Sequence, residues 1–442
     1  MKTHLNIRKE GREYEMKNEM KFEQARKFED ELGQCQRCGY CTFWCPIYQE
    51  EPTESNVARG KHTMIKQLLS GQTEFNKASE ELLNRCTLCG NCSQHCKFKV
   101  KTESVIVGTR ADKAHYQGIR FPYNIIFRRL LPHRKLFGNV VKTARWFQNI
   151  FLPKTEGTIR HLPFFLTAIG KGRNIPSIAP KFLREMVPVV NKPLGSAKRT
   201  LKVGFFAGCS TDFVYPEIGK KIIEFINKQG VEVIVPSEQG CCGAPVYLGA
   251  GDFETGRKIA DKNVKAFSEV DYIITGCATC ASSLKDYEKY LADTSERETA
   301  YGKFSAKIKD FSQFLVDVLN LPDSAYQTSQ KAKGLKITWH DPCHLVRYLG
   351  VKEQPRKIMM ALKDVEYIEM IRPDWCCGMA GTFSVYYYDL SKKIAERKMD
   401  SIKMTEADAV VTSCPGCMFQ LVDNIIRHKM PQKVMHIVEL FE

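Results

Sequence analysis

The sequence lacks long apolar runs. None of its 442 residues belongs to a stretch that approaches the roughly 18–20 consecutive apolar residues of a membrane-spanning helix, and the longest uncharged candidate, around residues 161–170, is too short. The N-terminus, MKTHLNIRKEGREYEMKNEM, alternates charges without the apolar core and small-residue cleavage site of a secretory signal. We therefore expect no membrane span and a cytoplasmic chain.

The sequence also lacks a glycine-rich dinucleotide-binding fingerprint. The segment GKGR near residue 170 follows no apolar run typical of a strand, and GAGDFETG at 249–256 lacks the strand–loop–helix context of that motif. We expect neither flavin nor NAD in this chain, so a cofactor of that kind must belong to another subunit.

Cysteine, in contrast, is abundant, with 18 residues. Reducing compartments keep thiols free and reserve cysteine clusters for metals or redox chemistry, so a disulfide scaffold is not expected. The composition, 43% hydrophobic and 26% charged, is typical of a soluble globular protein of two or three domains. The spacing of the cysteines then indicates which chemistry they serve.

Two runs near the N-terminus share the spacing C-x2-C-x2-C-x3-C, the signature of bacterial ferredoxins. Pro46 follows the first run and Lys97 the second. Because the fourth cysteine of each run ligates the other cluster in two-cluster ferredoxins, two [4Fe-4S] cubanes are predicted. Zinc sites or structural thiols are the alternatives, but zinc normally takes pairs of ligands. The predicted ligand sets are Cys35, Cys38, Cys41 and Cys96 for one cubane, and Cys86, Cys89, Cys92 and Cys45 for the other.

The remaining ten cysteines form two sets of five, displaced by 134–137 residues. Five thiolates exceed what one zinc ion uses, and adjacent cysteines can bridge neighbouring irons. The sequence therefore predicts two further metal sites. Their ligands are Cys209, Cys241, Cys242, Cys277 and Cys280 in the first copy, and Cys343, Cys376, Cys377, Cys414 and Cys417 in the second.

Short apolar runs alternate with helical segments after residue 200 and predict an α/β fold with parallel-type sheets. The expected strands are LKVGFFAGC, VEVIVP and DYIITGC in one copy and LKITWHDPC, VEYIEMI and DAVVTSC in the other, which indicates an internal duplication. The cysteines come just after these runs, at the carboxyl edge where open parallel sheets bind ligands, so the two sites should face each other.

Four segments are expected along the chain. An α-helical ferredoxin domain, with a charged helix through the first thirty residues and a helical spacer near 56–84, precedes a basic amphipathic segment with its linker and the two α/β copies. The boundaries are 1–115, 116–200, 201–330 and 331–442.

The spacing C-x31-CCG-x33-C-x2-C, followed by C-x32-CCG-x35-C-x2-C, resembles the CCG-domain family, and with the N-terminal ferredoxin the resemblance covers nearly the whole chain. That family includes iron-sulfur subunits of glycolate oxidase, of lactate dehydrogenase systems and of anaerobic glycerol-3-phosphate dehydrogenase, and the B and D subunits of heterodisulfide reductase. The resemblance implies a [4Fe-4S] cluster on each set of five cysteines, and in the B subunit of heterodisulfide reductase that cluster is noncubane.

The resemblance, carried also by CGYCTFWCPIYQEEPTESNVARGK, implies an electron-transfer subunit. It would pass electrons from a flavin-dependent 2-hydroxyacid dehydrogenase of the glycolate or lactate type to a quinone, a cytochrome or another carrier. Two alternatives remain: a catalytic subunit that reduces a disulfide at the CCG-bound clusters, as in heterodisulfide reductase, and a relay adaptor for an electron-transferring flavoprotein. No catalytic residue is predicted.

Basic charge is concentrated in residues 97–202, which hold 22 Lys and Arg against 4 Asp and Glu. No nucleic-acid-binding module is visible, so nucleic acid is not an expected partner. Residues 116–152 interleave aromatic with basic residues, and a helix with Trp146, Phe147, Ile150 and Phe151 can lie on an anionic membrane surface. Alternatively, these apolar residues pack on the CCG domain while the lysines face water or an acidic subunit.

His340, Asp341 and His344 flank Cys343 in WHDPCHL. A hydrogen bond to cluster sulfur or a proton donor for thiol chemistry is one interpretation. The other is a turn that ends a strand, with Asp341 capping the helix that follows.

Overall fold

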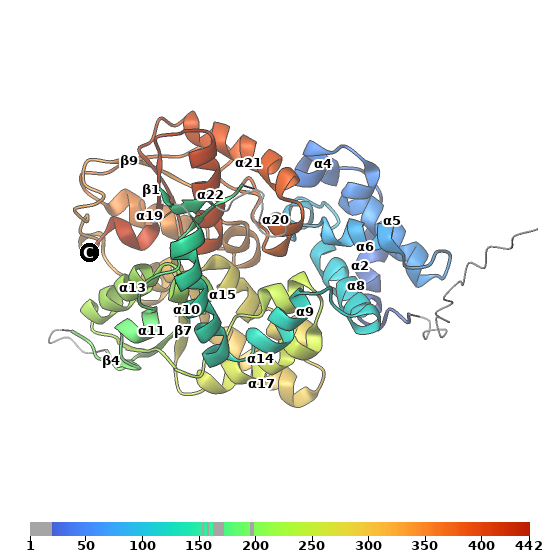
Figure 1. The fold of residues 1–442 in the computed structure, drawn as a ribbon, viewed down its shortest axis with the longest axis horizontal. Helices are drawn as coiled ribbons and strands as arrows, with labels where there is room; N and C mark the ends of the chain where they lie inside the picture. The colour runs from blue at the N-terminus through green and yellow to red at the C-terminus, as the bar shows by residue number, and fades with distance from the viewer. Residues whose placement is uncertain (1–19, 153, 157–158, 162–171, 195–198) are drawn as a thin grey trace, which may run out of the picture.

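The computed structural model describes residues 20–152, 154–156, 159–161, 172–194 and 199–442. Figure 1 shows a group of N-terminal helices at one end of the molecule and two α/β bodies beside it. The helix expected through the first thirty residues lies mostly outside the described residues; within them the chain begins with α1 (Glu23–Arg26) and α2 (Glu29–Gln34). The four predicted domain boundaries stay predictions.

The N-terminal helices pack around α8, whose residues Val105 and Ile106 are buried with Leu32 and Ile65. Asp112 of α8 accepts hydrogen bonds from the backbone N–H groups of Gln24 and Ala25, at 2.9 and 2.8 Å, and so fixes α1 on α8. The helical spacer expected near 56–84 is confirmed by α5 and α6. The bounds are α3 Cys41–Trp44, α4 Pro46–Glu50, η1 Glu54–Asn56, α5 Ala58–Leu69, α6 Lys77–Asn84, α7 Asn91–Gln94 and α8 Thr102–Gln117.

The first α/β body contains a five-stranded sheet in the order β4-β6-β5-β7-β8. The three strands expected here are present, and Val203, Val233, Ile273 and Ile274 are buried as in parallel sheets covered on both faces. β8 extends the parallel sheet, and β4 pairs antiparallel with β6, which the sequence pattern did not indicate. The bounds are β4 Val190–Asn191, β5 Lys202–Phe205, β6 Glu232–Ile234, β7 Tyr272–Thr275 and β8 Ile308–Asp310.

The second body repeats this topology in a parallel four-stranded sheet, β10-β9-β11-β12. The strand order matches that of β6-β5-β7-β8, so the duplication is confirmed at the level of the fold. Both sheets contribute to one continuous core of buried side chains, which includes Val203, Ile273, Ile337 and Val411. The bounds are β9 Lys336–Trp339, β10 Glu366–Ile368, β11 Ala409–Thr412 and β12 Lys433–His436.

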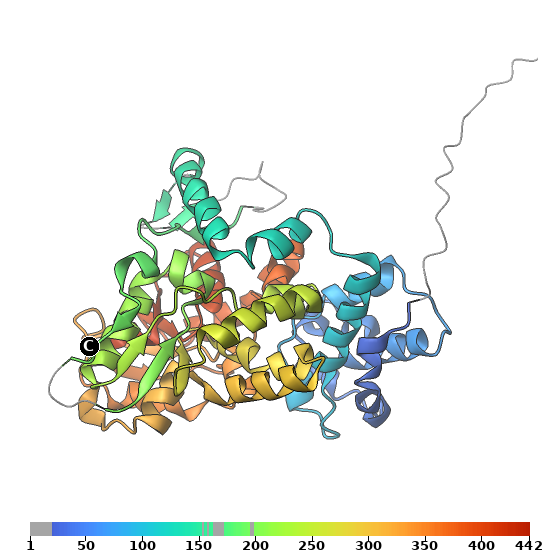
Figure 2. The ribbon, with the colours of Figure 1, turned by 90° about the horizontal axis from the view of Figure 1, so that it is seen from below.

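Helices cover the sheets of both copies (Figures 1 and 2). Those of the first copy are α12 Gly208–Phe213, α13 Pro216–Lys228, η4 Ala244–Gly249, α14 Phe253–Ala266, α15 Ala278–Lys285, α16 Tyr287–Leu291, α17 Ser295–Lys307, α18 Phe311–Gln313 and η5 Phe314–Val318. After η6 (Asp323–Ala325), the second copy has η7 His344–Tyr348, α19 Glu353–Ala361, α20 Thr382–Tyr386, α21 Tyr388–Lys403, α22 Pro415–Arg427 and η8 Ile437–Leu440.

The basic segment between the modules divides into a packed part and a projecting part. Phe127 and Leu131 are buried in the common core, whereas α10 (Arg134–Phe151) stands out from the body in Figure 2. Trp146 and Phe151 are 62% and 57% exposed, so the alternative in which these apolar residues pack on the CCG domain is wrong. No helix in the described part of the chain is long and apolar enough to cross a membrane.

The remaining elements of this segment frame α10. A small antiparallel sheet, β1-β2-β3, lies where a linker was expected. The sequence does not predict this sheet, because each strand has three residues, too few to show an alternation of apolar and polar side chains. The bounds are α9 Tyr123–Ile125, η2 Ile126–Leu130, β1 Lys154–Glu156, β2 Ile159–His161, β3 Asn174–Pro176 and α11 Leu183–Met186.

Candidate metal centres

Each large sheet has a topological switch point beside its central strand. β5 lies between β6 and β7, and β9 lies between β10 and β11, so the connection to the next strand runs to one side, the following connection returns to the other side, and a crevice opens between them. Cys209 follows β5 and Cys343 follows β9. The CCG loops follow the next strand of each copy, and the C-x2-C pairs follow β7 and β11.

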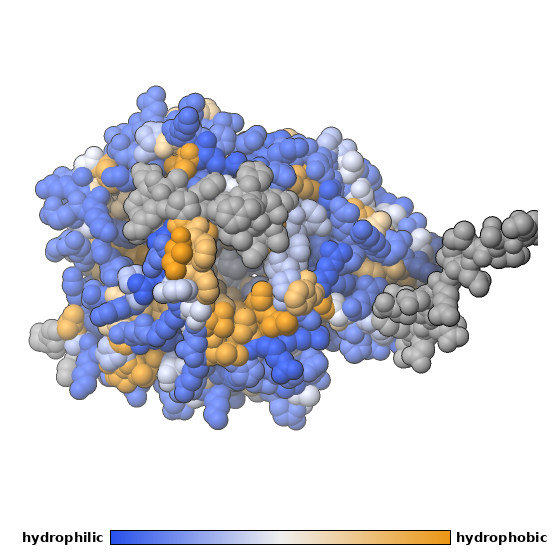
Figure 3. Space-filling view, in the orientation of Figure 1, coloured by the Kyte–Doolittle hydropathy of each residue, from blue (hydrophilic) through white to orange (hydrophobic). Residues whose placement is uncertain are grey.

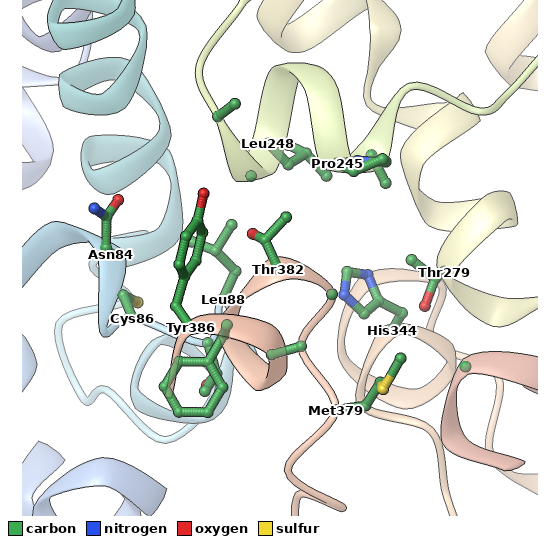
Figure 4. Close-up of a pocket in the computed structure, with 18 of the residues that line it drawn as sticks. Asn84, Cys86, Leu88, Pro245, Leu248, Thr279, His344, Met379, Thr382 and Tyr386 are labelled. Atoms are coloured by element: carbon green, nitrogen blue, oxygen red, sulfur yellow. The ribbon is translucent and has the colours of Figure 1, made fainter. Parts of the chain in front are cut away.

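The ten cysteines of the two copies line a single cavity of about 310 Å³. Figure 4 shows this cavity between the first copy, which contributes Pro245 and Leu248, and the second, which contributes Met379, Thr382 and Tyr386. The expectation that the two sites face each other is therefore confirmed.

Sulfur atoms crowd this cavity. Hydrogen bonds from Cys241 and Cys280 hold the pKa of Cys242 well below its usual range. In the second copy a hydrogen bond from Cys417 has the same effect on the pKa of Cys377. Thiols that share protons in this way have their sulfur atoms close enough to bind a common metal group.

Cysteine sulfurs of the two copies also lie next to each other. A hydrogen bond from Cys277 of the first copy lowers the pKa of Cys414 of the second, with Cys417 adding to the effect. The hydroxyl of Thr279 lies 3.5 Å from the Cys414 sulfur. The two candidate sites are thus contiguous.

The CCG turn has the same conformation in both copies. Gly243 and Gly378 have φ of +79° and +88°, which a residue with a side chain adopts at a cost. Their backbone N–H groups point to the sulfur two residues before, at 3.4 Å for Cys241 and 3.3 Å for Cys376. The glycine therefore lets the backbone fold over the first sulfur of each pair.

In the N-terminal module the structure brings the fourth cysteine of the first run to the second run. Cys45 lines a smaller cavity with Cys86, Cys89 and Cys92. Burial raises the pKa of Cys45 to about 11, and the ammonium of Lys61 opposes this rise. This grouping is the one that the ferredoxin signature predicts for the second cubane.

The other N-terminal set is less enclosed. Burial raises the pKa of Cys41, and the nearby thiol of Cys35 adds to the rise, while Cys38 is exposed. Trp44 stacks on His95 with ring centroids 3.5 Å apart, which joins the residues just before the fourth cysteine of each run. The grouping of these three cysteines with Cys96 stays a prediction.

The N-terminal module touches the second copy beside the sulfurs. Tyr348 donates a hydrogen bond to the carbonyl of Leu88 at 2.6 Å, and Arg347 donates one to the carbonyl of Cys89 at 3.4 Å. Cys86 lines both cavities. Burial raises the pKa of Cys343, and the thiol of Cys89 adds to it. The smaller cavity is thus next to the second copy's site.

A buried guanidinium fixes the N-terminal module on the first copy. Arg110 of α8 donates to the carbonyls of Leu83, Cys86 and Leu248 at 2.6, 2.8 and 3.0 Å, and burial lowers its pKa. Opposite it, a Cβ on Gly251 would lie 2.1 Å from the Arg110 carbonyl oxygen. Arg110 was not among the predicted functional residues, although a charge inside the apolar run SVIVGTRA is a usable signal.

The structure corrects one interpretation of the WHDPCHL segment. Asp341 caps no helix: it accepts a hydrogen bond from the Trp339 indole at 2.6 Å and pairs with Arg356 at 2.8 Å. His344 lies 2.6 Å from the Ser282 hydroxyl, and burial lowers its pKa to about 4. His340 is buried beside the second copy's sulfurs.

These sites suit iron-sulfur clusters. Each copy presents five cysteines, which are thiolate donors of the kind that iron-sulfur clusters require, on a largely buried wall. The cavity lies at the edge of each sheet where ligands are expected. The donor set therefore fits the group that the sequence predicts.

Comparisons with known proteins agree. The cysteine-rich domain family matches residues 203–285 and 337–422, and the 4Fe-4S dicluster domain family matches residues 31–100. The chain is 30% identical to the "Probable glycolate oxidase iron-sulfur subunit" of Bacillus subtilis (strain 168), over 97% of both chains.

Two further relatives extend the range of the family. The chain is 28% identical to the B subunit of the "Fumarate reductase (CoM/CoB)" of Methanothermobacter marburgensis, over 93% of this chain and 72% of that protein. It is 33% identical to "Lactate utilization protein A" of Geobacillus kaustophilus (strain HTA426), over 54% of this chain and 98% of that protein. The chain therefore belongs to the family of iron-sulfur proteins that join a 4Fe-4S dicluster domain to two cysteine-rich CCG domains, and it is an iron-sulfur electron-transfer subunit of an oxidoreductase.

Proposed function

We propose that the chain carries electrons from a flavin-containing 2-hydroxyacid dehydrogenase subunit, of the glycolate or lactate type, to a quinone or another carrier. The names of two relatives, a glycolate oxidase subunit and a lactate utilization protein, favour this class of substrate. One observation carries the relay role: three cysteine sets form a series, in which the set around Cys45 adjoins the second CCG copy and that copy adjoins the first.

The series has a definite order. The set with Cys45 adjoins the second copy through Cys89, and the second copy adjoins the first through Cys414 and Cys277. Iron-sulfur clusters supply one-electron steps when bound, and the chain's part is to hold their ligands close together.

We assign four [4Fe-4S] clusters to the 18 cysteines. Two cubanes take the ligand sets predicted from the ferredoxin runs. Each set of five CCG cysteines takes a further cluster, which we propose is noncubane because an adjacent pair of thiolates can bridge irons. Protein purified without oxygen should then contain about sixteen irons per chain. About eight irons would contradict the assignment of the CCG sites.

Purification of the native complex tests the partner. We expect anaerobic affinity purification, followed by mass spectrometry, to recover an FAD-linked hydroxyacid oxidase. Adding glycolate or lactate to that complex should bleach the iron-sulfur absorbance, and the isolated chain serves as the control. Recovery of an electron-transferring flavoprotein instead would make the chain a relay adaptor.

We further propose that α10 holds the chain on an anionic membrane surface at the cytoplasmic face, near a quinone acceptor. Trp146, Phe147, Ile150 and Phe151 are exposed near one end of the helix, within a strongly basic segment. Figure 3 shows apolar side chains gathered along α10 and over α9 and η2 on the same face. Apolar anchors with nearby cations are the features of interfacial helices.

The other end of α10 reaches the first CCG site, which makes this face suitable for electron exit. Arg134 forms an ion pair with Asp212, and burial lowers the pKa of Arg134 to about 10 while Cys209 and Cys241 oppose the change. The relay would therefore end next to the helix that contacts lipid.

Vesicle sedimentation tests this proposal. Vesicles with phosphatidylglycerol should retain the protein at low salt, and neutral vesicles should retain less. Trp146→Ser with Phe147→Ser should abolish retention, whereas Met404→Ser, at a residue 68% exposed in the second copy, should not. Equal retention of all three proteins would overturn the proposal.

A second candidate function is reduction of a disulfide in the cavity between the CCG sites. The ten cysteines of the two copies line one cavity, so a disulfide bound there would face both CCG sites, and one relative is part of a CoM/CoB fumarate reductase. The reaction would take two electrons and two protons and release two thiols. Reduced protein mixed with cystine or a mixed disulfide would release thiols; recovery of a b-type cytochrome or a heterodisulfide reductase flavoprotein, with no hydroxyacid oxidase, would favour this function.

A further inference from the structure

We propose that the imidazole of His340 donates an N–H···S hydrogen bond to a cysteine sulfur of the second CCG site, and that this bond makes the two duplicated sites unequal electron acceptors. The inference rests on the proposed assignment of the CCG cysteines as cluster ligands.

The position of His340 carries the argument. The residue directly follows β9 and is 1% exposed. One of its ring nitrogens and the sulfurs of Cys377 and Cys417 lie within 4.8 Å of one another. The imidazole is therefore beside two sulfurs of one site.

The ring has nothing else to bind. Within the residues that the structure describes, neither nitrogen of His340 has a nitrogen or oxygen partner, and the ring instead faces Cys377, whose pKa it helps to lower. A buried polar group without a partner is rare because it is costly. A sulfur of the bound site is the acceptor that the geometry offers to the N–H group.

The neighbouring charged groups are already engaged. Asp341 pairs with Arg356, and Lys398 donates to the carbonyls of Arg372 and Pro373 at 2.9 Å each. None of these contacts involves the imidazole, so His340 stays available to the site.

At the equivalent position the first copy has a phenylalanine, Phe206, in place of this histidine. The backbone N–H of Phe206 bonds the Ile274 carbonyl of β7 at 2.8 Å, and that of His340 bonds the Val411 carbonyl of β11 at 2.9 Å. The two residues thus occupy the same position after the central strand of each sheet. A benzyl ring stands where the second copy has a hydrogen-bond donor.

The physical consequence is a difference in potential. A hydrogen bond to sulfur stabilises the more negative, reduced state of a cluster and so raises its reduction potential. The second copy, which adjoins the ferredoxin module, therefore accepts an electron more readily than it would with the phenylalanine of the first copy.

The test uses the full chain purified anaerobically with its clusters. The parent is compared with His340→Phe, which copies the first site, and with His340→Gln, which keeps an N–H donor. We expect full iron content in both variants. In His340→Phe the equilibrium constant for one-electron reduction of the second CCG site should fall about tenfold, which lowers its midpoint potential by about 59 mV. His340→Gln should recover part of that shift.

Pulsed EPR of protein labelled with ¹⁵N-histidine gives an independent result. A weakly coupled histidine nitrogen should appear in the parent and vanish in His340→Phe. Phe206→Leu, the control in the first copy, should change neither the nitrogen signal nor the potential of the second site.

Three results would overturn the inference. The first is a strongly coupled nitrogen, which means that His340 ligates iron, and the second is an unchanged potential in iron-replete His340→Phe. If His340→Phe loses iron, His340→Leu replaces it, and the third result is then a His340→Gln potential as low as that of iron-replete His340→Leu. A parent with no iron at the second copy is a different failure, because it contradicts the ligand assignment before any variant is compared.

Discussion

The two CCG copies have the same strand order and the same cysteine pattern, but different groups lie beside their cysteines. The second copy contacts the ferredoxin module through Arg347 and Tyr348, directly beside Cys89. The first copy contacts the start of α10 through Asp212 and Arg134. The two copies thus share the arrangement that brings their cysteines together, while the groups around the two sites differ.

The difference is visible at matched positions. Four and five residues after the first cysteine, the second copy has Arg347 and Tyr348, and the first copy has Phe213 and Val214. Phe213 packs edge-on against Phe182, with centroids 4.7 Å apart, in an apolar cluster under α10. A ferredoxin module can therefore dock in the observed way on one copy only.

The largest difference between the two copies is expected when the adjacent cysteines of one copy are replaced. Cys241→Ala with Cys242→Ala, and Cys376→Ala with Cys377→Ala, should each lose about four irons. Only the second pair should also slow electron passage from the ferredoxin clusters to the other CCG site, because the ferredoxin module adjoins the second copy. Iron analysis and stopped-flow absorbance measure both effects; equal slowing in both variants would contradict the order.

The CCG glycines should differ in tolerance to alanine. Positive φ costs about 1–2 kcal/mol at either position. At Gly378 the new Cβ would also lie 2.4 Å from the Ser391 carbonyl oxygen, whereas at Gly243 the nearest atom is a Tyr247 ring carbon at 3.2 Å. Gly378→Ala should therefore cost about 3 kcal/mol or more and lose iron, and Gly243→Ala should keep it. Thermal unfolding and iron content under argon check this; a larger loss in Gly243→Ala would refute it.

Asp310 and His436 lie at the ends of equivalent strands, and their contributions to stability should depend on pH in opposite directions. Asp310 pairs in register with Thr275, and His436 with Thr412. Burial raises the pKa of Asp310 from 3.8 to about 6 and lowers that of His436 from 6.5 to about 4. The contribution of Asp310 is therefore fully present below pH 3.8 and is lost as the pH rises through about 6, whereas that of His436 is present above pH 6.5 and is lost as the pH falls towards 4.

Neutral variants separate the two effects. Asp310→Asn should gain stability relative to the parent as the pH rises, and His436→Gln should gain as the pH falls, each by at most about 3 kcal/mol. Denaturant midpoints measured anaerobically across this range give the slopes. Slopes of the same sign in both variants would show that burial does not shift the pKa values of Asp310 and His436 in opposite directions.

The smallest effect is expected at the module interface. Tyr348→Phe removes the hydrogen bond to the Leu88 carbonyl, worth about 1 kcal/mol. Tyr290→Phe is the control on the first copy, because that hydroxyl lies 3.4 Å from the Ser104 hydroxyl in a weaker contact. Hydrogen exchange of residues 86–96 should speed up in Tyr348→Phe only. Faster exchange in the control as well would mean that both copies hold this loop.

Local patterns predicted much of this molecule. Short apolar runs such as DYIITGC and DAVVTSC specified the strands, since a buried parallel strand needs continuous apolar residues. The C-x2-C-x2-C-x3-C spacing predicted that Cys45 lies with Cys86, Cys89 and Cys92. These features depend on residues close in sequence or on a motif whose geometry is known.

The remainder depends on contacts between residues far apart in sequence. Arg347 and Tyr348 meet Cys89 and Leu88 across about 260 residues, and no periodicity reports that. Asp341 looked like a helix cap because it precedes a helical pattern, but Arg356 and the Trp339 indole take its oxygens. The sequence also left undecided whether the apolar side of α10 is exposed, because an amphipathic pattern fits a packed helix and a lipid-bound helix equally.

The cavity between the two CCG copies can be completed only late in synthesis of the chain. Domains fold in the order in which they leave the ribosome. The cavity that contains Cys45 has its last cysteine once residue 92 has emerged, whereas the cavity between the copies has no complete wall until Cys417 appears. On a nascent chain, the five thiols of the first copy therefore lack the wall that the second copy supplies until more than a hundred further residues have been made.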